Sequence, residues 1–138
     1  MSNNISEKIH SKPNSIYFSY ESSGGDFLLQ TIKISYNSSD KKLERVETPG
    51  NITTTKNLTL EDEKRFMDKL KSIDFFNLKD KYLAERPPVG VYTYHLFVFI
   101  VYPSNTGLAL NAIHSVTWQT GSDAPNDLFS LSKFIETL

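Results

Sequence analysis

The stretch that decides the fold reads Val91-Tyr92-Thr93-Tyr94-His95-Leu96-Phe97-Val98-Phe99-Ile100-Val101-Tyr102. It is the strongest strand pattern in the chain, because residues of alternating number point to opposite sides and both sides are largely apolar. Such a strand is typical of a sheet centre that is covered on both faces, or on one face by a partner chain. A turn over Pro103–Gly107 then returns the chain as a second strand, Leu108–Trp118.

Upstream of this hairpin, short β-branched and aromatic segments are separated by turn residues. The break at Ser22–Asp26 contains Gly24 and Gly25, which permit a positive φ or a close backbone approach. The predicted strands are Ser15–Glu21, Phe27–Tyr36, Lys42–Glu47 and a short edge strand, Ile52–Lys56.

Two segments carry helical periodicity. Thr59 can cap the first, which begins at Leu60 and buries the stripe that includes Phe66 and Leu70. The second follows a cap at Ser122 or Asp123, with Pro125 in its first turn. Residues 77–85 are charged and are expected to be irregular.

These elements predict an α+β domain, in the order β-β-β-(β)-α-β-β-α. Its sheet is antiparallel, with about five to six strands, and the two helices pack on it. Residues 1–14 are expected to form a flexible tail, and residues 15–138 a single domain.

Composition excludes several classes of protein. The 138 residues carry 15 basic and 16 acidic side chains and a net charge of -1, which argues against nucleic-acid binding by bulk electrostatics. The lack of cysteine excludes disulfides, thiolate metal sites and cysteine nucleophiles. The polar N-terminus and the short apolar run Leu96–Tyr102 indicate no signal peptide and no membrane span, so a cytoplasmic protein is expected.

No catalytic motif stands out. The sequence has neither a His-Glu-X-X-His helix nor a Gly-X-Ser-X-Gly turn, so neither a metal, a cofactor nor an enzymatic activity is expected. If the hairpin turn centres on Asn105, His95 falls opposite Ser115 and His114 opposite Leu96, with the imidazoles on opposite faces. An enzyme built from the dispersed residues His95, Asp74 and Glu85 is the lowest-ranked alternative.

Two loops are candidate binding sites, because rigid exposed loops lose little entropy on binding. One supplies Ser23, Gly24, Gly25 and Asp26; the other supplies Arg86, Pro87 and Pro88. A structural turn is the alternative role of each. Three aromatic side chains offer a second kind of site, a ligand pocket between sheet and helices, although core packing is their commoner role. They are Tyr92, Tyr94 and Trp118.

The chain also resembles a known family. A first strand ends in Ser23-Gly24-Gly25, a capped helix leads to Phe75-Phe76-Asn77-Leu78, and the Tyr94-His95-Leu96-Phe97-Val98 strand precedes a closing helix with Leu128 and Leu131. This arrangement resembles the emfourin type of small protein over residues 16–138. The resemblance implies an inhibitor of thermolysin-like metalloproteases. A longer insert between Tyr36 and Asn57 and the proline-rich loop depart from the family pattern, so no reactive loop is assigned.

The sequence therefore predicts a non-catalytic protein-binding module, with a protease inhibitor as its specific version. The expected partner is another protein, a protease among the candidates, and neither nucleic acid nor membrane. A homo-oligomer is a further expectation, because the strand Val91–Tyr102 is apolar on both sides. The alternatives are a small-ligand binding protein that uses the aromatic pocket and a domain with a structural or interaction role.

Overall fold

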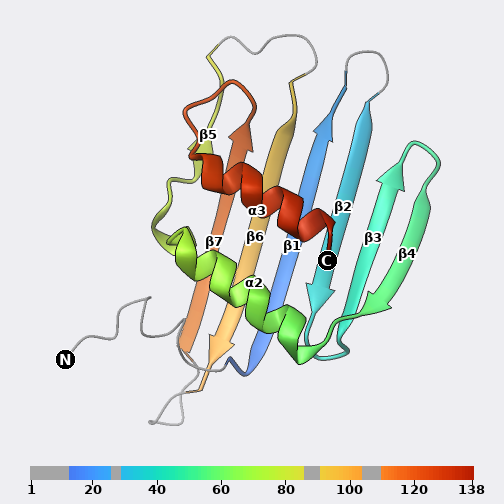
Figure 1. Ribbon diagram of the computed structural model, residues 1–138, viewed down its shortest axis with the longest axis vertical. Helices are drawn as coiled ribbons and strands as arrows, with labels where there is room; N and C mark the ends of the chain where they lie inside the picture. The colour runs from blue at the N-terminus through green and yellow to red at the C-terminus, as the bar shows by residue number, and fades with distance from the viewer. Residues whose placement is uncertain (1–12, 26–28, 86–90, 104–109) are drawn as a thin grey trace.

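The computed structural model describes residues 13–25, 29–85, 91–103 and 110–138. Their strands form one sheet in the order β4-β3-β2-β1-β6-β7-β5 (Figure 1). Neighbouring strands are antiparallel except β5 and β7, which are parallel. The strands are β1 (Ser15–Gly24), β2 (Gln30–Asn37), β3 (Lys42–Thr48), β4 (Ile52–Asn57), β5 (Lys81–Tyr82), β6 (Thr93–Tyr102) and β7 (Leu110–Gln119).

The α+β class is confirmed, and the described part of the chain has seven strands where five to six were expected. The additional strand is β5, whose two residues pair with Thr117 and Trp118 of β7. Two residues carry no detectable periodicity, which explains why the sequence did not reveal this strand. The edge strand β4 was predicted correctly, and all of its residues are exposed.

The prediction that β1 ends at Glu21 is wrong. The strand continues to Gly24, because Ser22 and Ser23 pair with β2 on one side and with β6 on the other. Hydrogen bonding to two neighbouring strands here outweighs the turn preference of Ser and Gly, since β propensity depends strongly on context. Ser22 is accordingly buried rather than part of an exposed loop.

The hairpin of β6 and β7 forms as predicted, but in a different register. His95 lies opposite Thr117 and His114 opposite Val98, each two residues from the expected position. A shift of two residues keeps every side chain on its original face. The prediction that the two imidazoles point to opposite faces is therefore confirmed.

Helix α2 (Leu60–Ser72) begins where its sequence indicates. The Thr59 hydroxyl accepts a hydrogen bond from the Asp62 backbone N–H at 3.1 Å, and the Asp62 carboxylate accepts one from the Thr59 N–H at 2.9 Å. This reciprocal capping box satisfies two N–H groups that have no partner inside the helix. The Thr59 N–H is also the main reason that the pKa of Asp62 lies below its usual range. A single 3-10 turn, η1 (Phe75–Asn77), follows the helix.

Helix α3 (Asn126–Glu136) begins later than predicted. Neither Ser122 nor Asp123 is its cap; Pro125 occupies that position and makes no side-chain cap bond. The Ser122 hydroxyl is used in the preceding turn instead, where it donates to the Gln119 carbonyl at 2.6 Å and accepts from the Ala124 N–H at 3.2 Å. A side chain that stabilises one turn in this way cannot also cap a helix that starts later.

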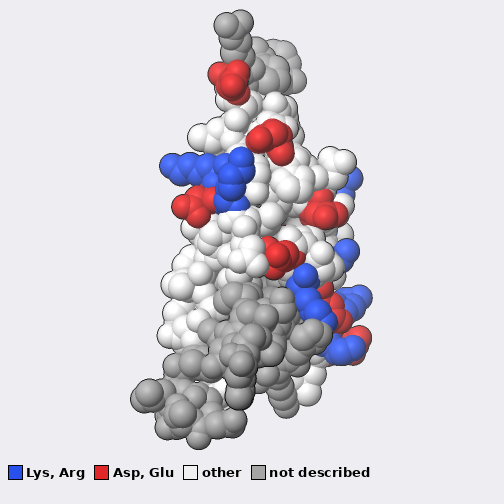
Figure 2. All heavy atoms as spheres, turned by 90° about the vertical axis from the view of Figure 1, so that its left-hand side faces the viewer, with Lys and Arg blue, Asp and Glu red and all other residues white. Residues whose placement is uncertain are grey.

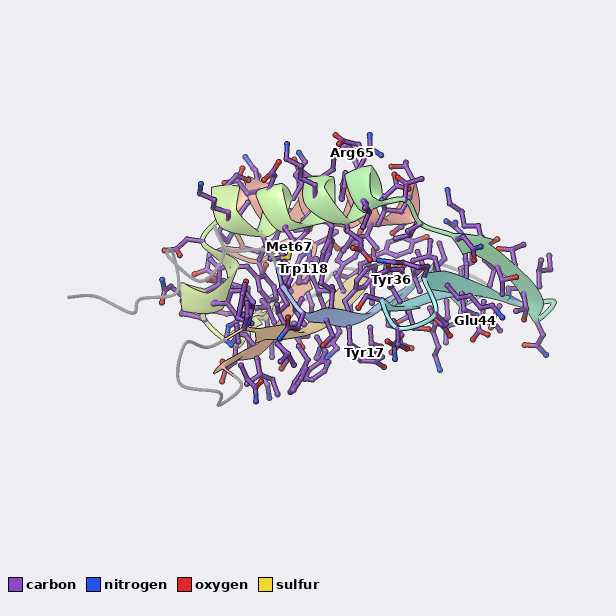
Figure 3. The ribbon with its side chains drawn as sticks, turned by 90° about the horizontal axis from the view of Figure 1, so that it is seen from below. Tyr17, Tyr36, Glu44, Arg65, Met67 and Trp118 are labelled. Atoms are coloured by element: carbon purple, nitrogen blue, oxygen red, sulfur yellow. The ribbon has the colours of Figure 1, made fainter. Side chains whose placement is uncertain are left out.

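Both helices lie on the same face of the sheet (Figures 1 and 3). The core is the layer between them, where the rings of Phe18 and Phe66 stack with centroids 4.5 Å apart and Trp118 has no exposed surface. Figure 3 shows Met67, Trp118 and Tyr36 in this layer and Tyr17 on the other side of the sheet. Within the described residues, the sheet is thus covered by helices on one face. The described helices do not supply the second cover expected for β6, and cover of its other face by a partner chain, the alternative expectation, stays a prediction.

Candidate protein interface

The face of the sheet opposite the helices is called the open face here. On β6 it receives the odd-numbered side chains from Thr93 to Val101, since the even-numbered ones from Leu96 to Tyr102 are buried in the core. Pairing extends this face to the odd-numbered residues of β1 and β7, since paired residues share a side of the sheet.

One half of the open face carries the large apolar side chains, with Ser15, Ser19, Asn111 and Ser115 beside them. Phe99 lies between Tyr17 of β1 and Ile113 of β7, so these three side chains form a row across the sheet. Tyr17 is 38% exposed and Ile113 58% exposed. The Tyr17 and Phe97 rings meet edge to face with centroids 6.1 Å apart. The open-face patch comprises the side chains Tyr17, Phe97, Phe99, Val101 and Ile113.

The other half of the open face is polar, and its groups bond one another. His95 Nδ1 and Thr117 Oγ1 lie 2.8 Å apart on neighbouring strands. The Gln119 amide nitrogen donates to the Thr93 hydroxyl at 3.1 Å, and its oxygen accepts from the Ala84 N–H at 2.9 Å. These polar side chains already have hydrogen-bond partners within the chain. The surface that this face offers to another molecule is therefore mainly the open-face patch.

The first predicted binding loop is divided by the structure. Ser23 and Gly24 belong to β1, Gly25 follows with a φ of 140°, and Asp26 lies outside the described residues. A Cβ on Gly24 would lie 2.7 Å from the Val91 carbonyl oxygen and 2.8 Å from the Tyr92 ring. Both reasons proposed for the glycine pair, positive φ and close approach, are therefore confirmed. Close packing of Gly24 against Tyr92 is a structural role.

The second predicted loop, with Arg86, Pro87 and Pro88, lies outside the described residues. So does most of the predicted tail, of which Pro13 and Asn14 are described. The Asn14 N–H donates to the Val101 carbonyl at 2.7 Å. The chain thus enters β1 beside the open-face patch.

The three predicted pocket residues do come together. The Tyr94 ring stacks on Trp118 with centroids 5.5 Å apart and an interplanar angle of 14°, and Tyr92 follows at 6.3 Å from Tyr94. Phe129 of α3 packs its ring against Tyr94 edge to face at 5.8 Å. Burial, and then the nearby Glu136 carboxylate, raises the pKa of Tyr94. Because neighbouring rings occupy the aromatic faces that a ligand would need, this packing favours a core role.

A shallow recess of about 260 Å³ lies near the start of β4. The apolar part of its wall comes from Ile32, Pro49 and Ile52, and Glu47 adds a carboxylate. Arg45 lies beside this carboxylate at 3.4 Å and also donates to the Glu136 carbonyl at 2.7 Å. The Glu47 charge is therefore already paired, and the recess offers mainly a small apolar surface.

The dispersed residues of the enzyme alternative do not bond one another. Asp74 accepts a hydrogen bond from the Asn77 side chain at 2.9 Å, while His95 pairs with Thr117. Among the hydrogen bonds of residues 13–25, 29–85, 91–103 and 110–138, none joins two of His95, Asp74 and Glu85. The same residues contain no group of three or more His, Asp or Glu side chains arranged for a metal ion.

Charge is dispersed over the surface. Figure 2 shows acidic and basic side chains interleaved on the side of the molecule that carries β5. Pairs of opposite sign include Lys33 with Glu21 at 3.9 Å and Lys79 with Asp123 at 3.9 Å. In the described part of the chain, no helix is both long enough and apolar enough to cross a membrane.

No protein-family model matches the chain, and no curated protein matches it.

The sequence pointed to part of the open-face patch and missed the rest. The alternation in β6 marked Phe97, Phe99 and Val101 as a second apolar side of that strand. Nothing local marked Tyr17 and Ile113 as their neighbours, because strand pairing brings them there. An apolar residue at an outward position of each flanking strand was the available signal.

Proposed function

We propose that the chain is a non-catalytic protein-binding module that docks its partner on the open-face patch. The observation that carries the proposal is the row of Tyr17, Phe99 and Ile113, apolar side chains on a face that no described helix covers. Tyr and Phe are enriched in the cores of protein interfaces, where they bury a large area at a low cost in entropy. An exposed apolar patch with a polar border is the usual form of such a site.

The rest of the open face fits this function. The sheet is held by continuous antiparallel pairing from β4 to β7, so the patch is rigid before binding. The hydrogen-bonded polar half beside it supplies a border that stays compatible with water. A partner would lose little entropy to ordering of this surface.

The specific partner that we propose first is a thermolysin-like metalloprotease, on the strength of the resemblance to the emfourin type. The purified chain is titrated against such a protease, and the expected result is inhibition with a one-to-one stoichiometry. Absence of both inhibition and binding would remove the protease as the partner.

The binding surface itself is tested with Ile113→Lys, which places a charge in the open-face patch. The matched control is Leu60→Lys on α2, because Leu60 is 64% exposed and Ile113 58% exposed. Immobilised wild type and both variants are exposed to the same cell extract. A partner retained by Leu60→Lys and lost by Ile113→Lys supports the proposal, and identical binding by all three proteins contradicts it.

A further inference from the structure

The two edges of the sheet are built differently. One edge is β5, which has two residues, and the other is β4, which has six. All residues of β4 are exposed, and Figure 1 shows no described helix or strand beyond it. A very short edge strand is a common protection against pairing with another chain, whereas a strand of average length is able to pair. The edge that can accept a further strand is therefore β4.

The backbone of β4 has hydrogen-bonding groups that point away from the sheet. The Leu58 N–H donates to the Lys41 carbonyl at 2.9 Å, so these opposite residues form a hydrogen-bonded pair where the ladder of β3 and β4 ends. In an antiparallel ladder, every second residue bonds the same neighbour. The even-numbered residues of β4 therefore bond β3, and the odd-numbered ones direct their N–H and C=O groups outward. The outward residues are Thr53, Thr55 and Asn57.

The even-numbered side chains of β4 lie on the helix side of the sheet. Lys56 is opposite Leu43, which is buried in the core, and Ile52 is opposite Glu47. Because every second side chain of a strand shares a face, Ile52, Thr54 and Lys56 form a row on this side. Figure 3 shows β3 and β4 extending past the helix layer, and all three residues of the row are exposed. The row is thus open to a strand placed beside β4.

The two ends of this row differ in chemistry. At one end, the Lys56 ammonium makes no ion pair with the described residues. At the other end, Ile52 is 57% exposed and borders the recess of about 260 Å³, together with Ile32 and Pro49. A carboxylate beside Lys56 and an apolar side chain beside Ile52 would complement the row.

We infer that β4 binds an extended acidic segment of another protein as an additional antiparallel strand. A carboxylate of this segment lies opposite Lys56, and an apolar residue four positions later lies opposite Ile52. Both side chains then occupy pairs without hydrogen bonds, in which opposite side chains are closest. Backbone bonds to the outward residues supply affinity, and the two side chains supply specificity. This edge is separate from the open-face patch, so the inference goes beyond the proposed function and does not depend on it.

The lysine also distinguishes this partner from a second copy of the chain. β4 carries one cation, Lys56, and no carboxylate. Pairing of two β4 strands would bring a second ammonium group to the junction and would supply no opposite charge to either. A lysine on an edge strand opposes such self-association, and the same charge attracts an acidic strand.

The probe is a synthetic peptide with a fluorophore at its N-terminus and the sequence Thr-Glu-Thr-Val-Thr-Leu-Thr-amide. In the inferred register its Glu lies opposite Lys56 and its Leu opposite Ile52. Fluorescence anisotropy is measured with the full chain from about 1 µM to about 500 µM, which brackets a dissociation constant in the micromolar range. Amide hydrogen exchange with and without the peptide locates the site, and protection should appear at the N–H groups of Thr53 and Thr55.

Variants on both sides test the pairing. Thr55→Pro removes an outward N–H and should weaken binding by about fivefold or more, at a position where an edge strand tolerates proline. A peptide with Pro in place of the Thr that precedes Val should lose affinity in the same way, and it requires no change in the protein. Circular dichroism checks that each protein variant is folded.

The charge is tested separately. Lys56→Glu should weaken binding by about two- to fivefold, the range of exposed ion pairs, and should bind a peptide with Lys in place of Glu better than wild type does. Lys81→Glu makes the same change on β5, at the other edge of the sheet, and should leave the affinity unchanged. Ile113→Lys, which tests the open-face patch, should also leave it unchanged.

Absence of peptide binding at the highest concentration overturns the inference, as does equal binding of the proline peptide. A loss through Lys81→Glu as large as through Lys56→Glu overturns it as well. Protection confined to β1, β6 and β7 also refutes it, and assigns the peptide to the open-face patch. Sedimentation velocity of the chain alone covers the remaining case: self-association that Thr55→Pro abolishes would give the edge to a second copy and refute the inference.

Discussion

The hydroxyl of Tyr20, in the middle of β1, donates a hydrogen bond to the carboxylate of Glu136, 116 residues later in the last turn of α3. Glu136 is also held through its carbonyl, which accepts from Arg45 of β3 at 2.7 Å. The end of the last helix is thus tied to two strands of the sheet. Tyr36 of β2 makes the equivalent bond to Glu63 of α2, so each helix has a tyrosine–carboxylate link to the sheet.

Tyr20→Phe should lower the free energy of unfolding by about 1.5–3 kcal/mol, since it removes a hydrogen bond to a charged group and leaves Glu136 without that donor. Urea unfolding followed by circular dichroism measures the change. Tyr17→Phe is the control: Tyr17 is partly exposed, and its variant should stay within about 0.5 kcal/mol of wild type. Equal stability of Tyr20→Phe and Tyr17→Phe would contradict a role for the bond.

Stability should fall in alkaline solution. Burial is the largest cause that raises the pKa of Tyr20 and Tyr36, and it raises that of Tyr102 to about 12. A raised pKa means that, above pH 10.0, the tyrosine keeps its proton in the folded state and loses it in the unfolded state. The contribution of the tyrosine to the free energy of unfolding is therefore full below pH 10.0 and declines above it. Each such tyrosine should add a slope of about 1.4 kcal/mol per pH unit between pH 10.0 and its folded pKa.

Urea unfolding from pH 8 to pH 12, with tyrosinate absorbance recorded in parallel, tests this slope. Tyr102→Phe should reduce the slope above pH 10.0 and leave the curve below it parallel to wild type. The Tyr102 hydroxyl is buried without a hydrogen-bond partner among the described residues, so its removal costs no bond there. A stability that is flat up to pH 12 would show that these hydroxyls ionise equally in both states.

Gly24→Ala should destabilise the fold by about 1–3 kcal/mol, because the new Cβ would overlap the Val91 carbonyl oxygen and the Tyr92 ring. The melting temperature and the urea midpoint report the change. Ser23→Ala is the neighbouring control, since Ser23 is half-buried and already carries a Cβ. A Gly24→Ala protein as stable as Ser23→Ala would mean that β1 and β6 can separate at this end without cost.

Thr59→Ala should cost about 0.5–2 kcal/mol, since it removes the oxygen that accepts the Asp62 N–H at the start of α2. The control is Ser130→Ala, at an exposed position of α3. The pKa of Asp62 is lowered, so the stability that its carboxylate contributes is present above pH 3.8 and is lost as the pH falls through the folded pKa. Comparison of both variants with wild type at neutral and acidic pH tests the cap, and a cost for Thr59→Ala no larger than for Ser130→Ala would contradict it.

Local patterns were the reliable part of the sequence. Thr59 and the acidic residues after it marked the start of α2, because capping depends on residues within one turn. The two aromatic and aliphatic sides of β6 were visible because a strand alternates its side chains. Two predictions failed where a partner far along the chain decided the outcome, namely the end of β1 at Gly24 and the two residues of β5. The start of α3 was missed for a local reason, because the Ser122 hydroxyl bonds within the preceding turn.

For the candidate site, too, the sequence showed what depends on local residues and missed what depends on strand pairing. Of the residues singled out beforehand, Gly24 and Trp118 have packing roles that can be seen only when their neighbours from other strands are in place. Tyr17 and Ile113 were not singled out, because each is a lone apolar residue in its own segment. Strand pairing makes them a surface.

The sequence by itself determined that β6 would be a strand with two apolar sides, since alternation is a local property of its residues. It could not determine which side the helices cover, because both sides read alike. The tertiary structure decided that question, through the connections that return α2 and α3 to one face of the sheet. Leu96, Val98 and Ile100 became core, and Phe97, Phe99 and Val101 became the open face.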